Sequence, residues 1–226
     1  MTMAGKGGRL LVGVAWAASL MLCGASSGAE DTQSPSEQAT SGDREAADPH
    51  AHHHHVLAAP TMVSRSTANY RTPEITLVRS DGAHVNFARE LDQDDRPVLL
   101  DFIYTSCTTI CPVLSQTLAE VQKRLGADAA KVKMVSVSID PEQDTPARLT
   151  DYAKRYQAGS QWTFYTGTMQ ASVAVQRAFD VYRGDKMNHT PVTLFRGAVG
   201  QPWVRLDGFA TPDVVLGYVH TQVAQK

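Results

Sequence analysis

Two cysteines, Cys107 and Cys111, stand four positions apart in the 226-residue chain, a spacing that permits both redox and metal chemistry. A thiol pair this close can form a disulfide, exchange it with another protein, or bind a soft metal ion as thiolates. Pro112 follows Cys111 directly, and proline is favoured in the first turn of a helix. We therefore expect Cys111 at or near a helix start, where the helix dipole lowers the thiol pKa and favours thiolate. A local disulfide that only pins the loop is the structural alternative.

A third candidate, His189, lies far downstream, shortly before an expected strand at residues 192–196. The order of elements places that strand beside the strand that leads to Cys107, so the loop carrying His189 can approach the cysteine turn. Two thiolates and one imidazole form a soft set of low coordination number that suits Cu(I) and tolerates Cu(II). Zinc normally takes a fourth ligand or a water. The pattern predicts a copper site made by Cys107, Cys111 and His189.

The elements that position these residues alternate between strands and helices. Nearly continuous apolar runs at 97–104 and 132–139 predict strands buried on both faces. Apolar residues at helical spacing predict a helix at 112–124, between those two strands. This alternation predicts an α/β sandwich with a mixed central sheet flanked by helices and preceded by an N-terminal hairpin, with the cysteines at the C-terminal edge of the sheet. Further strands are expected at 75–78, 84–87, 162–165, 192–196 and 203–206, and further helices at 145–156, 171–179 and 211–223.

Other residues near these elements have simpler interpretations. Asp140 and Asp144 follow the second buried strand and fit a turn and a helix start. Met187 is interpreted as a packing residue, with an occasional axial contact to a metal bound at His189, two positions later, as the alternative.

The N-terminal segment has the order of a targeting sequence. Lys6 and Arg9 precede an apolar run at 10–22, and small residues continue to Ala29. This order predicts a secretory signal peptide over residues 1–29, with an uncleaved membrane anchor as the alternative. We therefore expect the protein to be exported.

Residues 30–66 have the composition of a disordered tether, because polar and small residues dominate and cannot bury a core. Five of the six positions from His50 to His55 are histidines, which can capture transition metals with modest affinity. The folded domain is expected to occupy residues 67–226. The net charge of −2 gives no support for a nucleic-acid partner.

Two segments, FIYTSCTTICP at 102–112 and VSVSIDPEQDTP at 135–146, together with His189, resemble the Sco/SenC family of copper-binding assembly factors. The resemblance implies a thioredoxin-like fold, a membrane tether facing the periplasm or the intermembrane space, and copper ligands at Cys107, Cys111 and His189. Two positions depart from the usual family pattern. Thr108 stands where many members have proline, and Asn188 stands where many have aspartate.

The resemblance and the residues together favour a periplasmic copper metallochaperone, anchored to the inner membrane if the N-terminus is retained. Its partners would be the copper-accepting subunit of cytochrome c oxidase, or another cuproprotein, and a thiol reductant. The alternative is a thiol–disulfide oxidoreductase that reduces the cysteines of a cuproprotein and needs only Cys107 and Cys111. A thiol peroxidase is a third hypothesis, for which the sequence shows no further motif.

Overall fold

An eight-stranded mixed sheet organises the residues that the computed structural model describes, 63–93 and 95–223. Its strand order is β1-β8-β7-β4-β5-β6-β2-β3. The strands are β1 (Ser64–Ala68), β2 (Thr76–Arg79), β3 (His84–Asn86), β4 (Val98–Ile103), β5 (Lys133–Ser138), β6 (Trp162–Thr166), β7 (Val192–Arg196) and β8 (Trp203–Asp207). The helices are α1 (Phe87–Asp92), α2 (Ile110–Leu125), α3 (Pro146–Arg155), α4 (Met169–Ala178) and α5 (Pro212–Val223), with short 3₁₀ helices η1 (Gly126–Lys131) and η2 (Lys186–Asn188).

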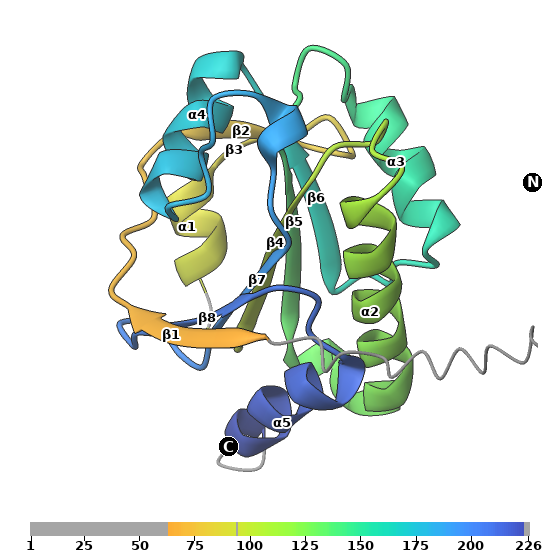
Figure 1. Cartoon of the computed structure of the whole chain (residues 1–226), viewed down its shortest axis with the longest axis vertical. Helices are drawn as coiled ribbons and strands as arrows, with labels where there is room; N and C mark the ends of the chain where they lie inside the picture. The colour runs from red at the N-terminus through yellow and green to blue at the C-terminus, as the bar shows by residue number, and fades with distance from the viewer. Residues whose placement is uncertain (1–62, 94, 224–226) are drawn as a thin grey trace, which may run out of the picture. The chain divides into compact units, whose positions relative to one another are not determined.

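Strands β4, β5 and β6 run parallel in the middle of the sheet, and every residue of β4 and β5 is buried. Parallel neighbours need crossover connections, and here α2 joins β4 to β5 while α3 joins β5 to β6. Figure 1 shows α2 and α3 on one side of the strands and α1 and α4 on the other. This two-sided cover explains why the central strands read as continuous apolar runs rather than as alternating patterns.

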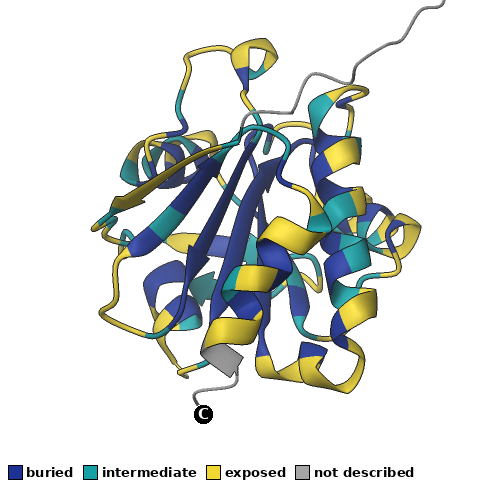
Figure 2. Cartoon of the chain, turned by 60° about the horizontal axis from the view of Figure 1, so that its bottom comes forward, coloured by how far each residue is buried: buried dark blue, intermediate teal, exposed yellow. Residues whose placement is uncertain are grey.

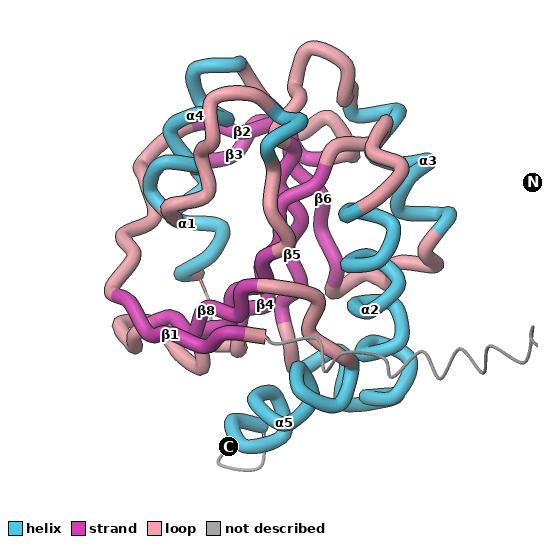
Figure 3. The backbone as a smooth tube through the Cα atoms, in the orientation of Figure 1, coloured by secondary structure: helices cyan, strands magenta, loops and turns pink. Residues whose placement is uncertain are grey.

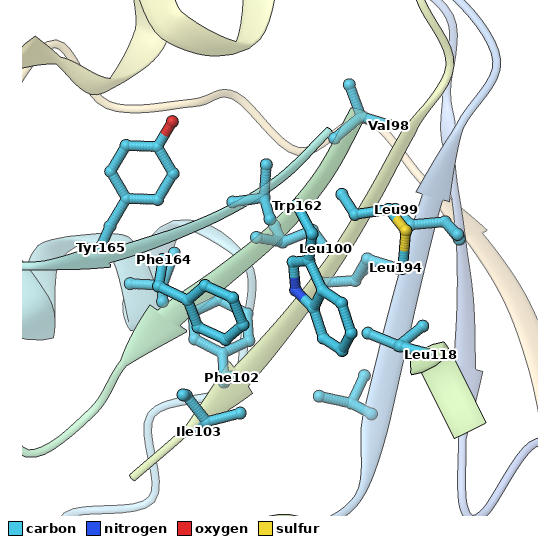
Figure 4. Packing of buried hydrophobic residues seen from close by; sticks show 14 of the residues in the cluster. Val98, Leu99, Leu100, Phe102, Ile103, Leu118, Trp162, Phe164, Tyr165 and Leu194 are labelled. Atoms are coloured by element: carbon cyan, nitrogen blue, oxygen red, sulfur yellow. The ribbon is translucent and has the colours of Figure 1, made fainter. Parts of the chain in front are cut away.

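The core lies between the sheet and these helices. Figure 2 shows the central strands buried along their length, while the helices expose their outer faces. Side chains of β4 and β6 meet Leu118 of α2 and Leu194 of β7 in the close view of Figure 4. Among them, Trp162 stacks on Phe164 with ring centroids 5.2 Å apart. Burial of these aromatic and aliphatic side chains is the main term that stabilises the layered fold.

Strand β7 pairs antiparallel with β4, with Thr193 opposite Asp101 and Arg196 opposite Val98. The start of β7 therefore lies beside the end of β4, from which the chain continues to Cys107. The predicted adjacency of this strand and the strand that leads to Cys107 is confirmed. Figure 3 shows these strands between the two helical layers.

Most predicted elements agree with the structure to within two residues at their ends, and near the N-terminal end of the described chain two elements, β1 and α1, depart from the sequence predictions. Strand β1 begins at Ser64, before the predicted domain start at residue 67, because the polar SRSTA segment gains its order from backbone pairing with β8 rather than from apolar side chains. Helix α1 was not predicted; it is six residues long and is capped by Asn86, whose side chain accepts from the Arg89 N–H. The predicted hairpin is confirmed as β2 and β3.

The predicted signal peptide or membrane anchor at 1–29 lies outside the described residues, as does all but the end of the predicted tether at 30–66. Within residues 63–93 and 95–223, no helix has the length and apolar character needed to cross a membrane.

Candidate metal and thiol site

The cysteine turn leads from the end of β4 into helix α2. The helix begins at Ile110, so Cys111 is its second residue, and the N-cap position is held by Thr109, whose side chain makes no capping hydrogen bond. The Cys107 sulfur provides the missing capping hydrogen bond, because Sγ accepts the N–H of Cys111 at 3.4 Å. One otherwise unpaired N–H of the first helical turn is thereby satisfied by a thiol, and the two cysteines are held close together.

The two thiols have opposite tendencies to ionise. Burial disfavours the Cys107 thiolate, but hydrogen bonds from the N–H groups of Cys111 and Thr109 outweigh burial and lower the pKa of Cys107 to about 7. Burial dominates at Cys111, which is fully buried, and raises the pKa of its thiol. The sequence-based expectation that Cys111 carries the lowered pKa is therefore wrong. The helix N-terminus does favour a thiolate, but the one that it favours belongs to Cys107.

His189 lies at the C-terminal end of η2 and is buried. Its Nε2 lies 3.1 Å from the carbonyl oxygen of Phe102, in the strand that leads to the cysteines. A carbonyl oxygen only accepts hydrogen bonds, so Nε2 carries the proton and Nδ1 carries the lone pair that can bind a metal. Burial lowers the pKa of His189, which keeps the imidazole neutral and available as a ligand.

The structure brings Cys107 and Cys111 together and places His189 beside the end of the same strand. Among the described residues, no three His, Cys, Asp or Glu side chains are grouped closely enough to hold a metal ion as they stand. The donors themselves fit a soft ion, because one thiol ionises near neutral pH, the second is its neighbour, and the imidazole is neutral. Closing a three-ligand set would require side-chain movement at His189 or at the cysteine turn.

Asp144 anchors the cysteine turn to the end of β5, whereas the sequence favoured a turn or helix-start role for it over support of the cysteine site. Its carboxylate accepts the Thr105 N–H at 3.1 Å, the Thr105 hydroxyl at 2.6 Å and the Ser138 hydroxyl at 2.6 Å. The predicted helix start is provided by Thr145, whose hydroxyl accepts the Arg148 N–H. No pattern in the sequence distinguishes this buried acceptor from a turn residue.

Replacing Asp144 by asparagine is expected to destabilise the fold by about 1–3 kcal/mol, since an amide cannot accept all three donors and one is left buried without a partner. Urea denaturation measures the loss. Asp151→Asn is the matched control, because Asp151 is exposed on α3, and its free energy of unfolding should change by less than about 0.5 kcal/mol. Equal stability of the two variants would contradict the anchoring role.

The loop carrying His189 is held by an ion pair between Lys186 and the buried Asp140. The same ammonium lies 5.8 Å from the ring centroid of Tyr104, in cation–π range. On the outer side of the loop, His189 lines a cavity of about 370 Å³ together with Asp140, Arg183 and Lys186. The imidazole therefore lies between the sheet edge and a solvent-connected hollow.

Comparison with known proteins identifies the family. The family model described as SCO1/SenC matches residues 64–223, which include every described strand and helix. The chain belongs to the SCO1/SenC family. The family assignment made from the two sequence segments is confirmed.

The SCO1 protein homolog of Bacillus subtilis is 34% identical over 106 residues, a match that covers 46% of this chain and 53% of that protein. The match thus spans about half the length of this curated relative. The solved structure of BsSco, a member of the Sco family of cytochrome c oxidase assembly proteins, aligns with a TM-score of 0.58 and 27% identity over 71% of this chain and 98% of that one. The copper-bound structure of Arabidopsis thaliana ScoI aligns with a TM-score of 0.56 and 23% identity over 69% of this chain and 99% of that one. These likenesses confirm the predicted thioredoxin-like fold of this SCO1/SenC protein.

Proposed function

We propose that this SCO1/SenC protein is a copper metallochaperone, which binds copper as cargo through Cys107, Cys111 and His189 and passes it to another protein. The observation that carries the proposal is the pairing of a thiol of pKa about 7 with a second thiol and a neutral imidazole at one edge of the sheet. The copper in the solved Arabidopsis structure supports copper, in the Cu(I) or Cu(II) state, as the cargo.

The three ligands have distinct roles in this proposal. Cys107 is the ready thiolate, because about half of it is ionised near pH 7. Cys111 is protonated in the metal-free protein, so loading releases its proton and becomes more favourable as pH rises. His189 offers Nδ1 while its Nε2–H stays on the Phe102 carbonyl, which fixes the tautomer.

The proposed recipient is the copper-accepting subunit of cytochrome c oxidase or another cuproprotein, and a thiol reductant keeps the cysteine pair reduced. The membership of BsSco in a family of cytochrome c oxidase assembly proteins supports this recipient.

We further propose export to the periplasm, with residues 1–29 acting as a signal peptide or as an inner-membrane anchor. Fractionation of cells that express the full chain, followed by N-terminal sequencing, distinguishes the two forms of the N-terminus.

The second candidate function is thiol–disulfide exchange, which the same cysteine geometry favours. The Cys107 thiolate would attack a partner disulfide and form a mixed disulfide, releasing one partner thiolate. Cys111 would then lose its proton and attack the Cys107 sulfur, leaving a Cys107–Cys111 disulfide and a reduced partner dithiol. The two electrons that reduce the partner come from this cysteine pair.

One mixing experiment separates the two functions. The reduced chain, with and without one equivalent of Cu(I), is mixed with the recipient domain in its dithiol and disulfide forms. The chaperone function predicts copper in the dithiol recipient, measured by metal analysis after separation. Reduction of the disulfide recipient by the metal-free chain, together with no copper transfer to the dithiol form, would favour the oxidoreductase function instead.

A further inference from the structure

Met187 presents a sulfur to solvent beside the cysteine turn. The residue is 72% exposed, the highest value among the exposed large hydrophobic residues of the described part of the chain. Its Sδ lies 3.9 Å from the Tyr104 hydroxyl. The Tyr104 side chain also hydrogen-bonds with Cys107, and the Cys107 N–H donates to the Tyr104 carbonyl at 3.1 Å. One phenol thus lies between the exposed thioether and the reactive thiol.

The position of Met187 is held by several contacts within its loop. The Asp185 carboxylate accepts the Met187 N–H at 2.8 Å and caps η2. The neighbouring Lys186 is paired with Asp140 and lies over the Tyr104 ring. His189 N–H closes the short helix on the Lys186 carbonyl at 3.1 Å. These contacts hold the backbone of the loop at Met187, and the exposed thioether lies 3.9 Å from the Tyr104 hydroxyl, beside the cysteine turn.

The chemistry of a thioether matches this placement. Sulfur in methionine is a soft donor that binds Cu(I). It carries no proton, so it can take up Cu(I) at any pH and release it without a proton transfer. Cys107, Cys111 and His189 are buried whereas Met187 is 72% exposed, so Met187 is the most accessible of these four donors to an incoming copper carrier.

We propose that Met187 is an exchange ligand for Cu(I), through which the cargo passes between a partner protein and Cys107. The inference rests on the chaperone function proposed above. In the exchange, an Sδ–Cu bond forms as one bond to the carrier breaks, and a bond to the Cys107 sulfur then replaces it. Copper remains Cu(I), no electron is transferred, and a proton leaves only if Cys107 was protonated.

The test measures Cu(I) loading and release in the full chain by stopped-flow absorbance with a chromophoric Cu(I) chelator, under anaerobic and reducing conditions. Met187→Leu preserves the size of the side chain and removes the sulfur. Both loading and release should slow by roughly tenfold, a cost comparable to losing a supporting group at a metal site. The equilibrium affinity should stay unchanged, because an exchange ligand changes the rates of loading and of release by the same factor.

Met169→Leu is the matched control for the loss of an exposed thioether, because Met169 is 43% exposed at the start of α4 and lines the same cavity as His189, but does not belong to the loop that carries His189. Its rates should equal those of the unchanged protein. Equal rates in Met187→Leu and the unchanged protein would overturn the inference, as would equal slowing in both variants or a loss of affinity in Met187→Leu. If the unchanged protein takes no Cu(I) from the chelator, the chaperone function itself fails, and the inference fails with it.

Discussion

Replacing Cys107 by serine is expected to remove both the reactive thiolate and tight copper binding. The affinity for Cu(I) should fall by more than about 100-fold. Losing a group that only supports a metal ligand costs up to about 100-fold, and Cys107 is proposed to be a ligand itself. The reason is that Cys107 is the thiol whose pKa is lowered to about 7 by the surrounding N–H groups, against the effect of its own burial. Ser106→Ala, in the same turn, is the matched control and should leave the affinity unchanged.

The pH dependence of alkylation tests the thiolate assignment without any metal. In the reduced unchanged protein, the rate of Cys107 alkylation by iodoacetamide should rise with pH along a curve whose midpoint lies at about 7. Cys111 should react slowly until denaturant is added, because burial raises its pKa and shields the sulfur. Mass spectrometry of the digested protein separates the two sites. A Cys107 profile with its midpoint at the ordinary value of 9.0 would contradict the assignment.

The second large effect is a fall in stability with rising pH that originates at Asp101. This carboxyl group is fully buried in β4; its Oδ1 accepts the Ser136 hydroxyl, while Oδ2 has no hydrogen-bond partner in the described structure. Burial raises the pKa of Asp101 to about 7. Because the folded pKa exceeds the unfolded value of 3.8, the folded state binds more protons between these values. The contribution of Asp101 protonation to the free energy of unfolding is therefore fully present below about pH 4 and is lost as pH rises through about 7.

Asparagine at position 101 cannot ionise and should remove this pH dependence. Between pH 5 and pH 8 the unchanged protein should lose about 2.5 kcal/mol more unfolding free energy than Asp101→Asn, at about 1.4 kcal/mol per pKa unit. Urea denaturation at both pH values gives the difference. Asp128→Asn, at an exposed ion pair with Lys131, is the control and should follow the unchanged protein. Parallel pH profiles for Asp101→Asn and the unchanged protein would show that Asp101 does not titrate in this range.

The sheet and the proximity of the site residues could be predicted from the sequence because they depend on strong patterns. The apolar runs of β4 and β5 identify buried parallel strands, and the following hairpin and helix place β7 beside β4. That adjacency was enough to bring His189 to the strand that precedes the cysteines. Short or polar elements were less predictable, since β1 depends on pairing with a partner strand and α1 has only six residues.

The properties of individual site groups could not be predicted, because they depend on burial and on partners far apart in the sequence. Pro112 correctly indicated a helix start near Cys111, but the sequence does not reveal that this sulfur is fully buried and that Cys107 receives the N–H. Asp144 acts on Thr105, 39 positions earlier in the chain. In both cases the sequence indicates the local structure, but the property of the side chain depends on a tertiary contact that the local sequence does not reveal.

The central claim is that His189 completes a copper site with the two cysteines. Its most direct test is a copper titration of the reduced chain from residue 60 onward, which contains every described strand and helix and omits the histidine tract. The unchanged protein and His84→Ala should each bind one equivalent of copper tightly, because His84 is exposed in β3 at the far edge of the sheet. His189→Ala should lose that binding or weaken it strongly, above all for Cu(II). Equal copper affinity in all three proteins would contradict the three-ligand site, and no tight copper in any of them would leave thiol–disulfide exchange as the function of the cysteine pair.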